Sequence, residues 1–283
     1  MDHAVFTSQK LQKRFANNGF VKLSIFSPDE VEQVLQKYQL FVSYHDSAGN
    51  RFHGTGWLEN PEMRVEISQS VFPVFKKAAD KIFKNYKIIG CGFLQKETGG
   101  DSDVKMHQDW TYVDESKFYS FNVWVALDDV SLKNGAMFVI PFSHKIFSGY
   151  LRPAPSYPIP FKNIINLLNY FQKPVELKRG ECVCFNNALL HGSYPNLEAS
   201  KRLALVATIL PIDADLIHHY VEDTHNPERI TEYNLGEESF LKIERGKAPK
   251  DFISKLKKTT VYPTTDSRFF LLHYVKNKIS SIF

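Results

Sequence analysis

The chain has 283 residues, of which 43% are hydrophobic and 23% are charged, and its formal net charge is +4. This composition is typical of a soluble domain with one sizeable core, and no run of about 18 apolar residues is present that would span a membrane. Three cysteines, Cys91, Cys182 and Cys184, are too few for a disulfide framework and indicate a reducing compartment. We therefore expect a single cytoplasmic domain over residues 1–283, without a signal peptide or a nucleic-acid partner.

Residues 1 to about 86 are predicted to form helices with short strands between them. Residues 9–17 form a short helix that ends at Asn18-Gly19, and residues 20–25 are typical of a strand. Ser27-Pro28-Asp29-Glu30 is a capping box with proline at the first helical position, so a helix is expected to begin there. A second amphipathic helix is expected over residues 74–83.

From about residue 87 to residue 211 the pattern changes to short apolar or alternating runs separated by Gly, Asp, Asn and Lys. Such runs are typical of a barrel or a two-sheet jelly roll. Residues 143–174 interrupt them with proline and aromatic residues, and are expected to hold a helix at 163–171 and to act as a lid or binding loop. Residues 212–283 form a mixed extension, in which the basic stretch 242–258 is interpreted as the solvated face of a helix.

His107 and Asp109 indicate a metal site. Residues two apart in a strand point to the same side, so the imidazole and the carboxylate are expected to converge. A second histidine, His191, ends a later strand-like run. Two histidines and one carboxylate on a β scaffold form the facial triad of non-heme Fe(II) oxygenases, which leaves coordination positions open.

Arg202 opens an alternating run in which it shares one face with Ala204, Val206 and Thr208. A buried arginine on such a face is costly without an anionic partner. A dicarboxylate would supply that partner, because the guanidinium group pairs bidentately with a carboxylate. The alternative is an arginine at the exposed start of a strand. Ser193 is expected to add its hydroxyl to the same carboxylate.

Four segments resemble, in order and spacing, those of the phytanoyl-CoA dioxygenase family over about residues 88–211. They are HQDWTYV, FNVWVALDDVSLKNGAMFVIPFSHK, RGECVCFNNALLHGS and RLALVATI. The resemblance implies a mainly β fold with added helices around a double-stranded β-helix (jelly-roll, cupin-like) core. It also implies Fe(II) as the metal, with 2-oxoglutarate and O₂ as cosubstrates.

The resemblance assigns roles to six side chains: His107, Asp109 and His191 bind Fe(II), while Arg202, Ser193 and Trp124 bind or pack against 2-oxoglutarate. It further implies that 2-oxoglutarate yields succinate and CO₂ while an unactivated C–H bond is hydroxylated. The implied substrate is a small organic or carrier- or lipid-linked molecule. The carboxylate of Asp109 favours hydroxylation over halogenation, which uses a small residue at this position.

The sequence departs from the family pattern at Phe142, where the family usually has glycine, and this puts the local turn in question. His144 in the same motif is expected to be structural rather than a metal ligand. Asn134-Gly135 is expected to form a turn in which glycine supplies the positive φ angle.

The substrate pocket is expected to draw on residues 52–57, on Trp110, Thr111 and Tyr112, and on the excursion 143–174. Gln95, Lys96 and Asn122 are further candidates to approach the iron or the cosubstrate. Two other functions stay open: a jelly-roll binding protein without turnover, and a zinc-dependent hydrolase with the same triad. The hydrolase would give no reason for Arg202.

Overall fold

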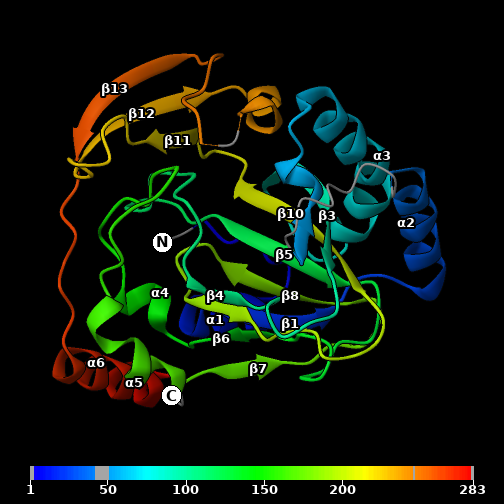
Figure 1. Cartoon of the computed structure of the whole chain (residues 1–283), viewed down its shortest axis with the longest axis horizontal. Helices are drawn as coiled ribbons and strands as arrows, with labels where there is room; N and C mark the ends of the chain where they lie inside the picture. Colours follow the sequence, from blue (N-terminus) through cyan, green and yellow to red (C-terminus); the bar gives the residue numbers. More distant parts are fainter. Residues whose placement is uncertain (1–2, 42–50, 245, 282–283) are drawn as a thin grey trace.

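The centre of the molecule is a jelly roll made of two antiparallel sheets (Figure 1). The computed structural model describes residues 3–41, 51–244 and 246–281. The larger sheet has the strand order β1-β8-β5-β10-β3-β2, and the smaller has the order β4-β9-β6-β7. The larger sheet contains β1 (Phe20–Ser24), β8 (Glu181–Asn186), β5 (Phe121–Ala126), β10 (Arg202–Pro211), β3 (Tyr86–Lys96) and β2 (Phe52–Gly54). The smaller sheet contains β4 (Val104–His107), β9 (His191–Ser193), β6 (Met137–Val139) and β7 (Lys173–Val175).

The alternation of side chains along β10 determines which residues face the inside of the jelly roll. Ala204 packs with Trp124 and Val139 in a core between the two sheets. Leu203 and Leu205 belong instead to a second core on the outer face of the larger sheet. Because successive strand residues point to opposite faces, Arg202 lies on the inner side, as predicted.

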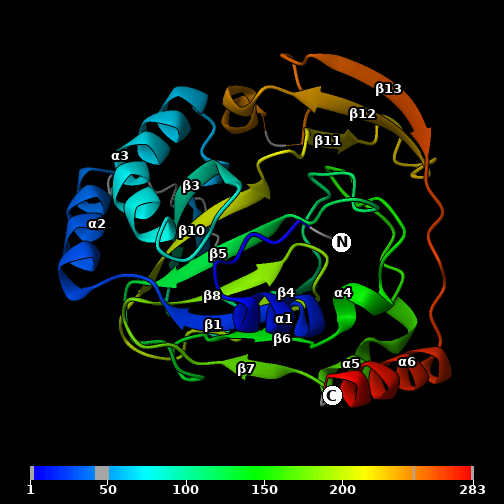
Figure 2. The same ribbon diagram turned by 180° about the vertical axis from the view of Figure 1, so that it is seen from behind.

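Three helices cover the outer face of the larger sheet: α1 (Gln9–Asn18), α2 (Pro28–Phe41) and α3 (Pro61–Ala79) (Figure 2). The capping box of α2 is confirmed, since Ser27 Oγ accepts from the Glu30 N–H at 3.2 Å and the Glu30 carboxylate accepts from the Ser27 N–H at 2.8 Å. The bounds predicted for the second helix were wrong. It begins at Pro61 because the Asn60 side chain caps its first turn, and it ends before residue 83.

The excursion after β6 contains α4 (Ser143–Ile146), a 3₁₀ turn η3 (Lys162–Ile164) and α5 (Ile165–Asn169), close to the predicted helix. The C-terminal extension forms a separate sheet of β11 (Leu216–Tyr220), β12 (Arg229–Leu235) and β13 (Ser254–Thr259), followed by α6 (Ser267–Ser280). Two short 3₁₀ turns lie beside the jelly roll, η2 (Thr55–Trp57) and η4 (Glu237–Lys242). The interpretation of residues 242–258 as a helix face is wrong, because residues 254–258 belong to the exposed edge strand β13. Its lysines are typical of a protected sheet edge.

Two turns carry residues with positive φ angles. Gly135 has φ 86°, as predicted, and a Cβ atom there would lie 2.5 Å from the Lys96 side chain. Phe142 has a φ angle of 69°, which is unusual for a residue with a side chain. Its ring packs on Tyr274 of α6, with the ring centroids 5.4 Å apart. Burial of the ring therefore offsets a conformation that glycine adopts more readily. Across the described part of the chain, no helix has the length and apolar character needed to cross a bilayer.

Candidate active site

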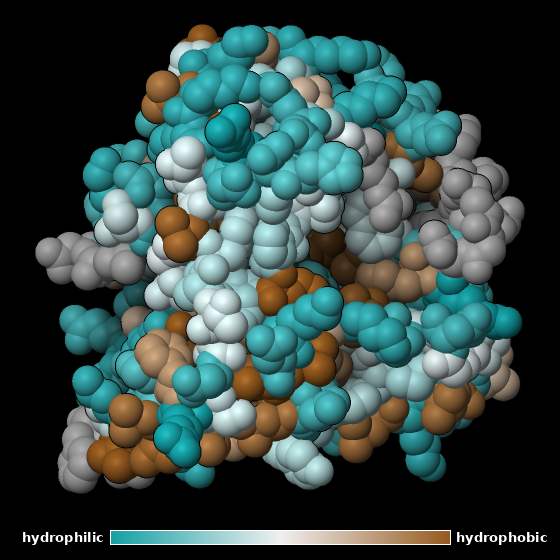
Figure 3. All heavy atoms as spheres, turned by 60° about the vertical axis from the view of Figure 1, so that its left-hand side comes forward, coloured by the Kyte–Doolittle hydropathy of each residue, from teal (hydrophilic) through white to brown (hydrophobic). Residues whose placement is uncertain are grey.

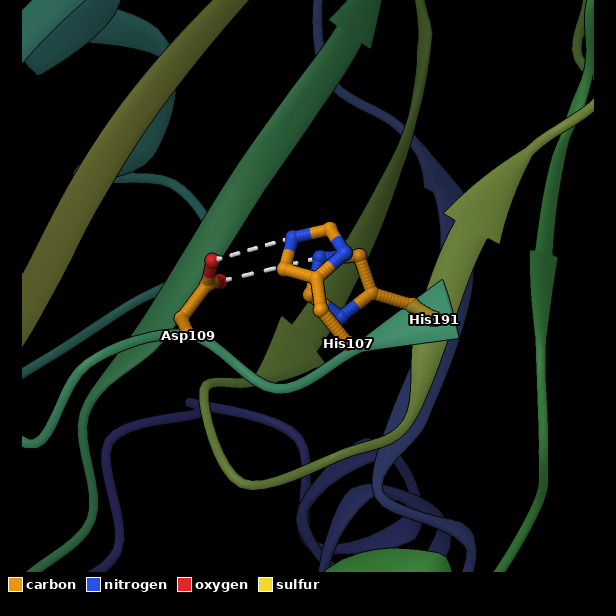
Figure 4. A group of neighbouring side chains, drawn as sticks. All are labelled: His107, Asp109 and His191. Atoms are coloured by element: carbon orange, nitrogen blue, oxygen red, sulfur yellow. Dashed lines mark ion pairs between the residues drawn. The ribbon is translucent and has the colours of Figure 1, made fainter. Parts of the chain in front are cut away.

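His107, Asp109 and His191 converge at one end of the jelly roll (Figure 4). His107 and His191 are directly opposite each other in the β4–β9 pair, with ring centroids 4.3 Å apart. Their Nε2 atoms lie 3.7 and 3.8 Å from the two carboxylate oxygens of Asp109. The three donor atoms all lie within 4.8 Å of one another. This spacing and donor set suit a divalent transition metal such as Fe(II).

Backbone carbonyl groups fix the tautomer of both histidines. Nδ1 of His107 lies 2.8 Å from the Lys105 carbonyl oxygen, and Nδ1 of His191 lies 2.9 Å from that of Leu189. A carbonyl oxygen only accepts, so each Nδ1 carries the proton and each Nε2 presents its lone pair. Burial, and secondarily the nearby His107, lower the pKa of His191 to about 4, so this ring is neutral at pH 7.

A hydrogen-bond chain from the larger sheet orients the Asp109 carboxylate. Asn122 Nδ2 on β5 donates to Asp109 Oδ2 at 2.8 Å. Thr208 Oγ1 on β10 donates to Asn122 Oδ1 at 2.7 Å, and the two residues are cross-strand partners. The sequence makes Asn122 a candidate to approach the iron or the cosubstrate, whereas no sequence pattern indicates this contact for Thr208. Such partners of metal ligands hold their orientation.

The Arg202 guanidinium group is buried beside the triad without a hydrogen-bond partner for Nε or Nη1 in the described structure. It lies over the indole ring of Trp124, 4.7 Å from the ring centroid. Burial lowers the pKa of Arg202 to about 9, so the group is still a cation at pH 7. A buried cation with unused donors fits an anion such as the distal carboxylate of 2-oxoglutarate.

Lys96 is a second buried cation, opposite Arg202 in the β3–β10 pair. Its ammonium group donates to the hydroxyl of Ser193 at 2.7 Å and to the carbonyl oxygens of Ser102 and Tyr194 at 2.7 and 2.8 Å. Burial and the nearby Arg202 lower the pKa of Lys96 to about 7. The Ser193 hydroxyl is therefore held by Lys96 at the same end of the site as Arg202.

The excursion 143–174 packs behind the metal ligands and holds Gln108, which points away from the metal position. Gln108 Nε2 donates to the Phe147 carbonyl at 3.0 Å and to that of Ala188, while Oε1 accepts from the Tyr150 hydroxyl. The Gln108 carbonyl accepts from the Tyr157 hydroxyl at 2.8 Å. These contacts fix the strand end that carries His107 and Asp109.

Arg152 completes this support from the excursion. Its Nε donates to the Asp109 carbonyl oxygen at 2.6 Å, and its guanidinium group forms a bidentate pair with Glu115, with one contact at 3.0 Å. The backbones of Arg152 and Thr111 are also tied, because Thr111 N–H donates to the Arg152 carbonyl at 3.1 Å. The excursion thus supports the metal ligands from outside, and the sequence pattern gave no indication of this role.

All six residues assigned from the sequence line one cavity of about 290 Å³: His107, Asp109, Trp124, His191, Ser193 and Arg202. Phe52, Gly54, Gly56 and Trp57 form part of its wall, as expected for residues 52–57. Residues 110–112 and the excursion do not line this cavity. Phe240 and Leu241 of η4 line it, although no role is predicted for this segment.

Comparison with known protein families agrees with this geometry. The profile of the phytanoyl-CoA dioxygenase (PhyH) family matches residues 15–204, which is more than half of the chain. The chain belongs to the phytanoyl-CoA dioxygenase family. The matched range includes all six residues assigned from the sequence and the supporting Asn122.

Individual relatives of this phytanoyl-CoA dioxygenase family member are distant. Phytanoyl-CoA dioxygenase 1 of Oryza sativa subsp. japonica is 29% identical over 154 residues, or 47% of this chain and 51% of that protein, so the match spans about half of that relative. Dioxygenase trt7 of Aspergillus terreus is 23% identical over 255 residues, covering 81% and 82% of the two chains. The epimerase SnoN in complex with Fe³⁺, alpha ketoglutarate and nogalamycin RO has a TM-score of 0.56 at 16% identity, covering 92% and 96%. This last similarity shows the shared fold.

Proposed function

We propose that the protein is an Fe(II)- and 2-oxoglutarate-dependent dioxygenase that hydroxylates an unactivated C–H bond of a small organic or carrier- or lipid-linked substrate. One observation carries the proposal: three metal-donor side chains and the unpartnered Arg202 guanidinium group line the same cavity. A metal and a dicarboxylate together would satisfy both groups. The SnoN complex, which shares the fold, contains the same two kinds of ligand.

In this proposal, His107, Asp109 and His191 hold Fe(II) through two Nε2 atoms and one carboxylate oxygen. Arg202 pairs with the distal carboxylate of 2-oxoglutarate, while Ser193 and the Lys96 ammonium group add a hydroxyl and a positive charge beside it. Trp124 packs against the guanidinium group and fixes its plane. When bound, Fe(II) with 2-oxoglutarate and O₂ supplies the chemistry that converts R–H into R–OH, with succinate and CO₂ as the other products.

The rest of the cavity excludes water and receives the substrate. Phe52, Trp57, Phe240 and Leu241 form apolar parts of the cavity wall. Apolar walls lower the local dielectric and limit the access of water to the reacting groups. Asn122 would keep the Asp109 carboxylate in the orientation in which it can hold the metal.

Of the two other functions, the hydrolase accounts less well for the site, and the binding protein differs from the proposed enzyme only in turnover. A zinc-dependent hydrolase would use the triad but leave Arg202 buried and unpaired, at a cost in stability. A binding protein without turnover would retain iron and 2-oxoglutarate and yet form no succinate. Measuring binding and turnover on the same preparation separates these two cases from the proposed enzyme.

The direct test is succinate formation from 2-oxoglutarate with and without Fe(II), because such enzymes turn over slowly even without their substrate. We expect iron-dependent succinate from the wild-type protein and none above background from His107→Ala. His225→Ala is the matched control, because His225 is an exposed histidine outside the site. Iron-independent turnover, or a fully active His107→Ala variant, would show that the triad is not the metal site.

A further inference from the structure

The C-terminal helix α6 has two unlike faces. Its inner face is anchored in aromatic side chains of the excursion: Phe270 is buried, and its ring centroid lies 5.1 Å from that of Phe171. Tyr274 packs on the same Phe171 ring at 4.6 Å and on Phe142 at 5.4 Å. The orientation of α6 on the body of the protein is therefore fixed, and its outer face points away from the body.

The outer face of α6 is apolar. Leu272, Val275 and Ile279 follow one another at helical spacing and are 69%, 51% and 53% exposed. Leu271 and Phe269 on either side of this stripe are exposed as well. Apolar surface gathers along the lower edge of the face shown in Figure 3. The solvent face of a surface helix is normally polar, so a continuous apolar stripe marks a surface that another body covers.

Basic residues flank this stripe without acidic neighbours in the helix. Arg268, Lys276 and Lys278 are exposed, α6 contains no Asp or Glu, and no ion pair among the described residues involves these three. The lysines of β13 differ, because Lys257 and Lys258 pair with Glu222 and Glu232. The cations of α6 are therefore available to an anion outside the protein.

A basic hollow lies at the C-terminal end of α6. It has a volume of about 430 Å³ and is lined by Lys10, Lys13 and Arg14 of α1 and by Ser281, which follows α6. Like α6, α1 contains no acidic residue. The donors of Lys10 and Arg14 are suited to a phosphate group. The hollow thus lies at the C-terminal end of the helix that carries the apolar stripe.

We propose that α6 and the hollow beside it form a docking surface for an anionic membrane. The stripe Leu272–Val275–Ile279 enters the boundary between headgroups and acyl chains, while the flanking cations and the hollow take lipid phosphate groups. Exposed apolar area and nearby positive charge together favour binding to an anionic membrane surface. A symmetric contact between two copies through α6 is disfavoured, because it would bring the same three cations of each copy together.

The test is co-sedimentation of the full chain with vesicles, using phosphatidylcholine alone and a 3:1 mixture of phosphatidylcholine and phosphatidylglycerol. We expect binding to the anionic vesicles only, weakening as salt is added. Lys276→Gln combined with Lys278→Gln should lower partitioning by roughly 25-fold, about fivefold for each charge removed. Leu272→Glu should abolish binding, because it places a charge in the apolar stripe.

Matched controls lie elsewhere on the surface. Leu197 is 68% exposed in the loop between β9 and β10, so Leu197→Glu makes the same change away from α6. Lys77→Gln with Lys84→Gln removes two exposed charges near the end of α3. We expect both controls to bind as the wild type does. An unchanged melting temperature in every variant would exclude unfolding as the cause.

Four outcomes would overturn the proposal. The first is equal binding to neutral and anionic vesicles, and the second is equal loss in the control variants. The third is a dimer in light scattering that does not bind vesicles and that Leu272→Glu dissociates, which would assign the stripe to a second copy of the chain. Binding of inorganic phosphate in calorimetry without vesicle binding would likewise assign the hollow to a free anion. None of these measurements depends on turnover, so the result is independent of the proposed activity.

Discussion

The metal end of the cavity and its cationic end differ in how completely their hydrogen bonds are satisfied. At the metal end, both Nδ1 atoms and the Asp109 carboxylate have partners within the protein. At the cationic end, two of the nitrogens of Arg202 have none in the described structure, although the side chain is buried. The first end is pre-organised by the chain itself, and the second is completed only by a ligand.

Lys96 and Arg202 show the same difference at closer range. They are cross-strand partners and both are buried, yet Lys96 has three hydrogen-bond acceptors while Arg202 relies on contact with Trp124. Lys96 therefore serves the fold by joining β3 to the segments at Ser102 and Ser193. Arg202 adds little to stability and is the group whose removal should affect ligand binding most.

The largest expected effect follows from the unused donors of Arg202. Arg202→Ala should weaken 2-oxoglutarate binding about thirtyfold or more, because a buried charge-assisted pair is worth roughly 2–5 kcal/mol. Metal binding should persist, and the melting temperature without ligand should change little. Anaerobic titration of 2-oxoglutarate into the Mn(II)-loaded variant measures the first effect. An unchanged dissociation constant would transfer the role of anchor to Lys96.

The next effect tests the pre-organised end. Asn122→Ala removes the hydrogen bond that orients Asp109 and should lower Fe(II) affinity by about 10- to 100-fold. A chelator competition assay on the protein without 2-oxoglutarate measures this directly. Asn169→Ala on exposed α5 is the control and should match the wild type. Equal affinities of all three proteins would mean that the triad holds its geometry without this contact.

Much of the site was predictable because its residues follow local patterns. His107 and Asp109 are two apart in sequence, and Arg202 lies on the small-residue face of an alternating strand. Strand register, in contrast, places His107 opposite His191 and Lys96 opposite Arg202. Register is set jointly by the hydrophobic patterns of both strands and by the turns, so the pattern of one strand alone does not give it. For the same reason, the contact of Arg152 with Asp109 and the contribution of η4 to the cavity wall could not be predicted.

A smaller effect concerns pH and separates the two cations. Because burial lowers the pKa of Lys96 to about 7, its ammonium group loses its proton as pH rises through that value. The bound dicarboxylate favours the charged form, so 2-oxoglutarate affinity should be nearly constant below pH 6 and fall roughly tenfold between pH 6 and 8. Titrations of the Mn(II)-loaded protein measure this slope. Lys96→Met should remove it, and the same slope in the variant would assign it to another group.

The smallest effect lies one step further from the metal. Thr208→Val keeps the shape of the side chain but removes the hydrogen bond to Asn122 Oδ1. Fe(II) affinity should fall by about threefold to tenfold, since one neutral hydrogen bond contributes roughly 1 kcal/mol. The double variant with Asn122→Ala should be no weaker than Asn122→Ala alone, because Thr208 acts through Asn122. If the losses of Fe(II) affinity in the two single variants added up in the double variant, Thr208 would not act through Asn122.

The central claim is that the triad and Arg202 together receive one metal ion and one 2-oxoglutarate molecule. The most direct measurement is an anaerobic titration of 2-oxoglutarate into the Fe(II)-loaded protein, followed by the visible charge-transfer absorbance of the chelate. We predict a band that saturates at one equivalent, is absent from His107→Ala, and needs at least thirtyfold more 2-oxoglutarate in Arg202→Ala. That factor corresponds to about 2 kcal/mol. Tight 2-oxoglutarate binding without iron, or a wild-type band in His107→Ala, would contradict the account.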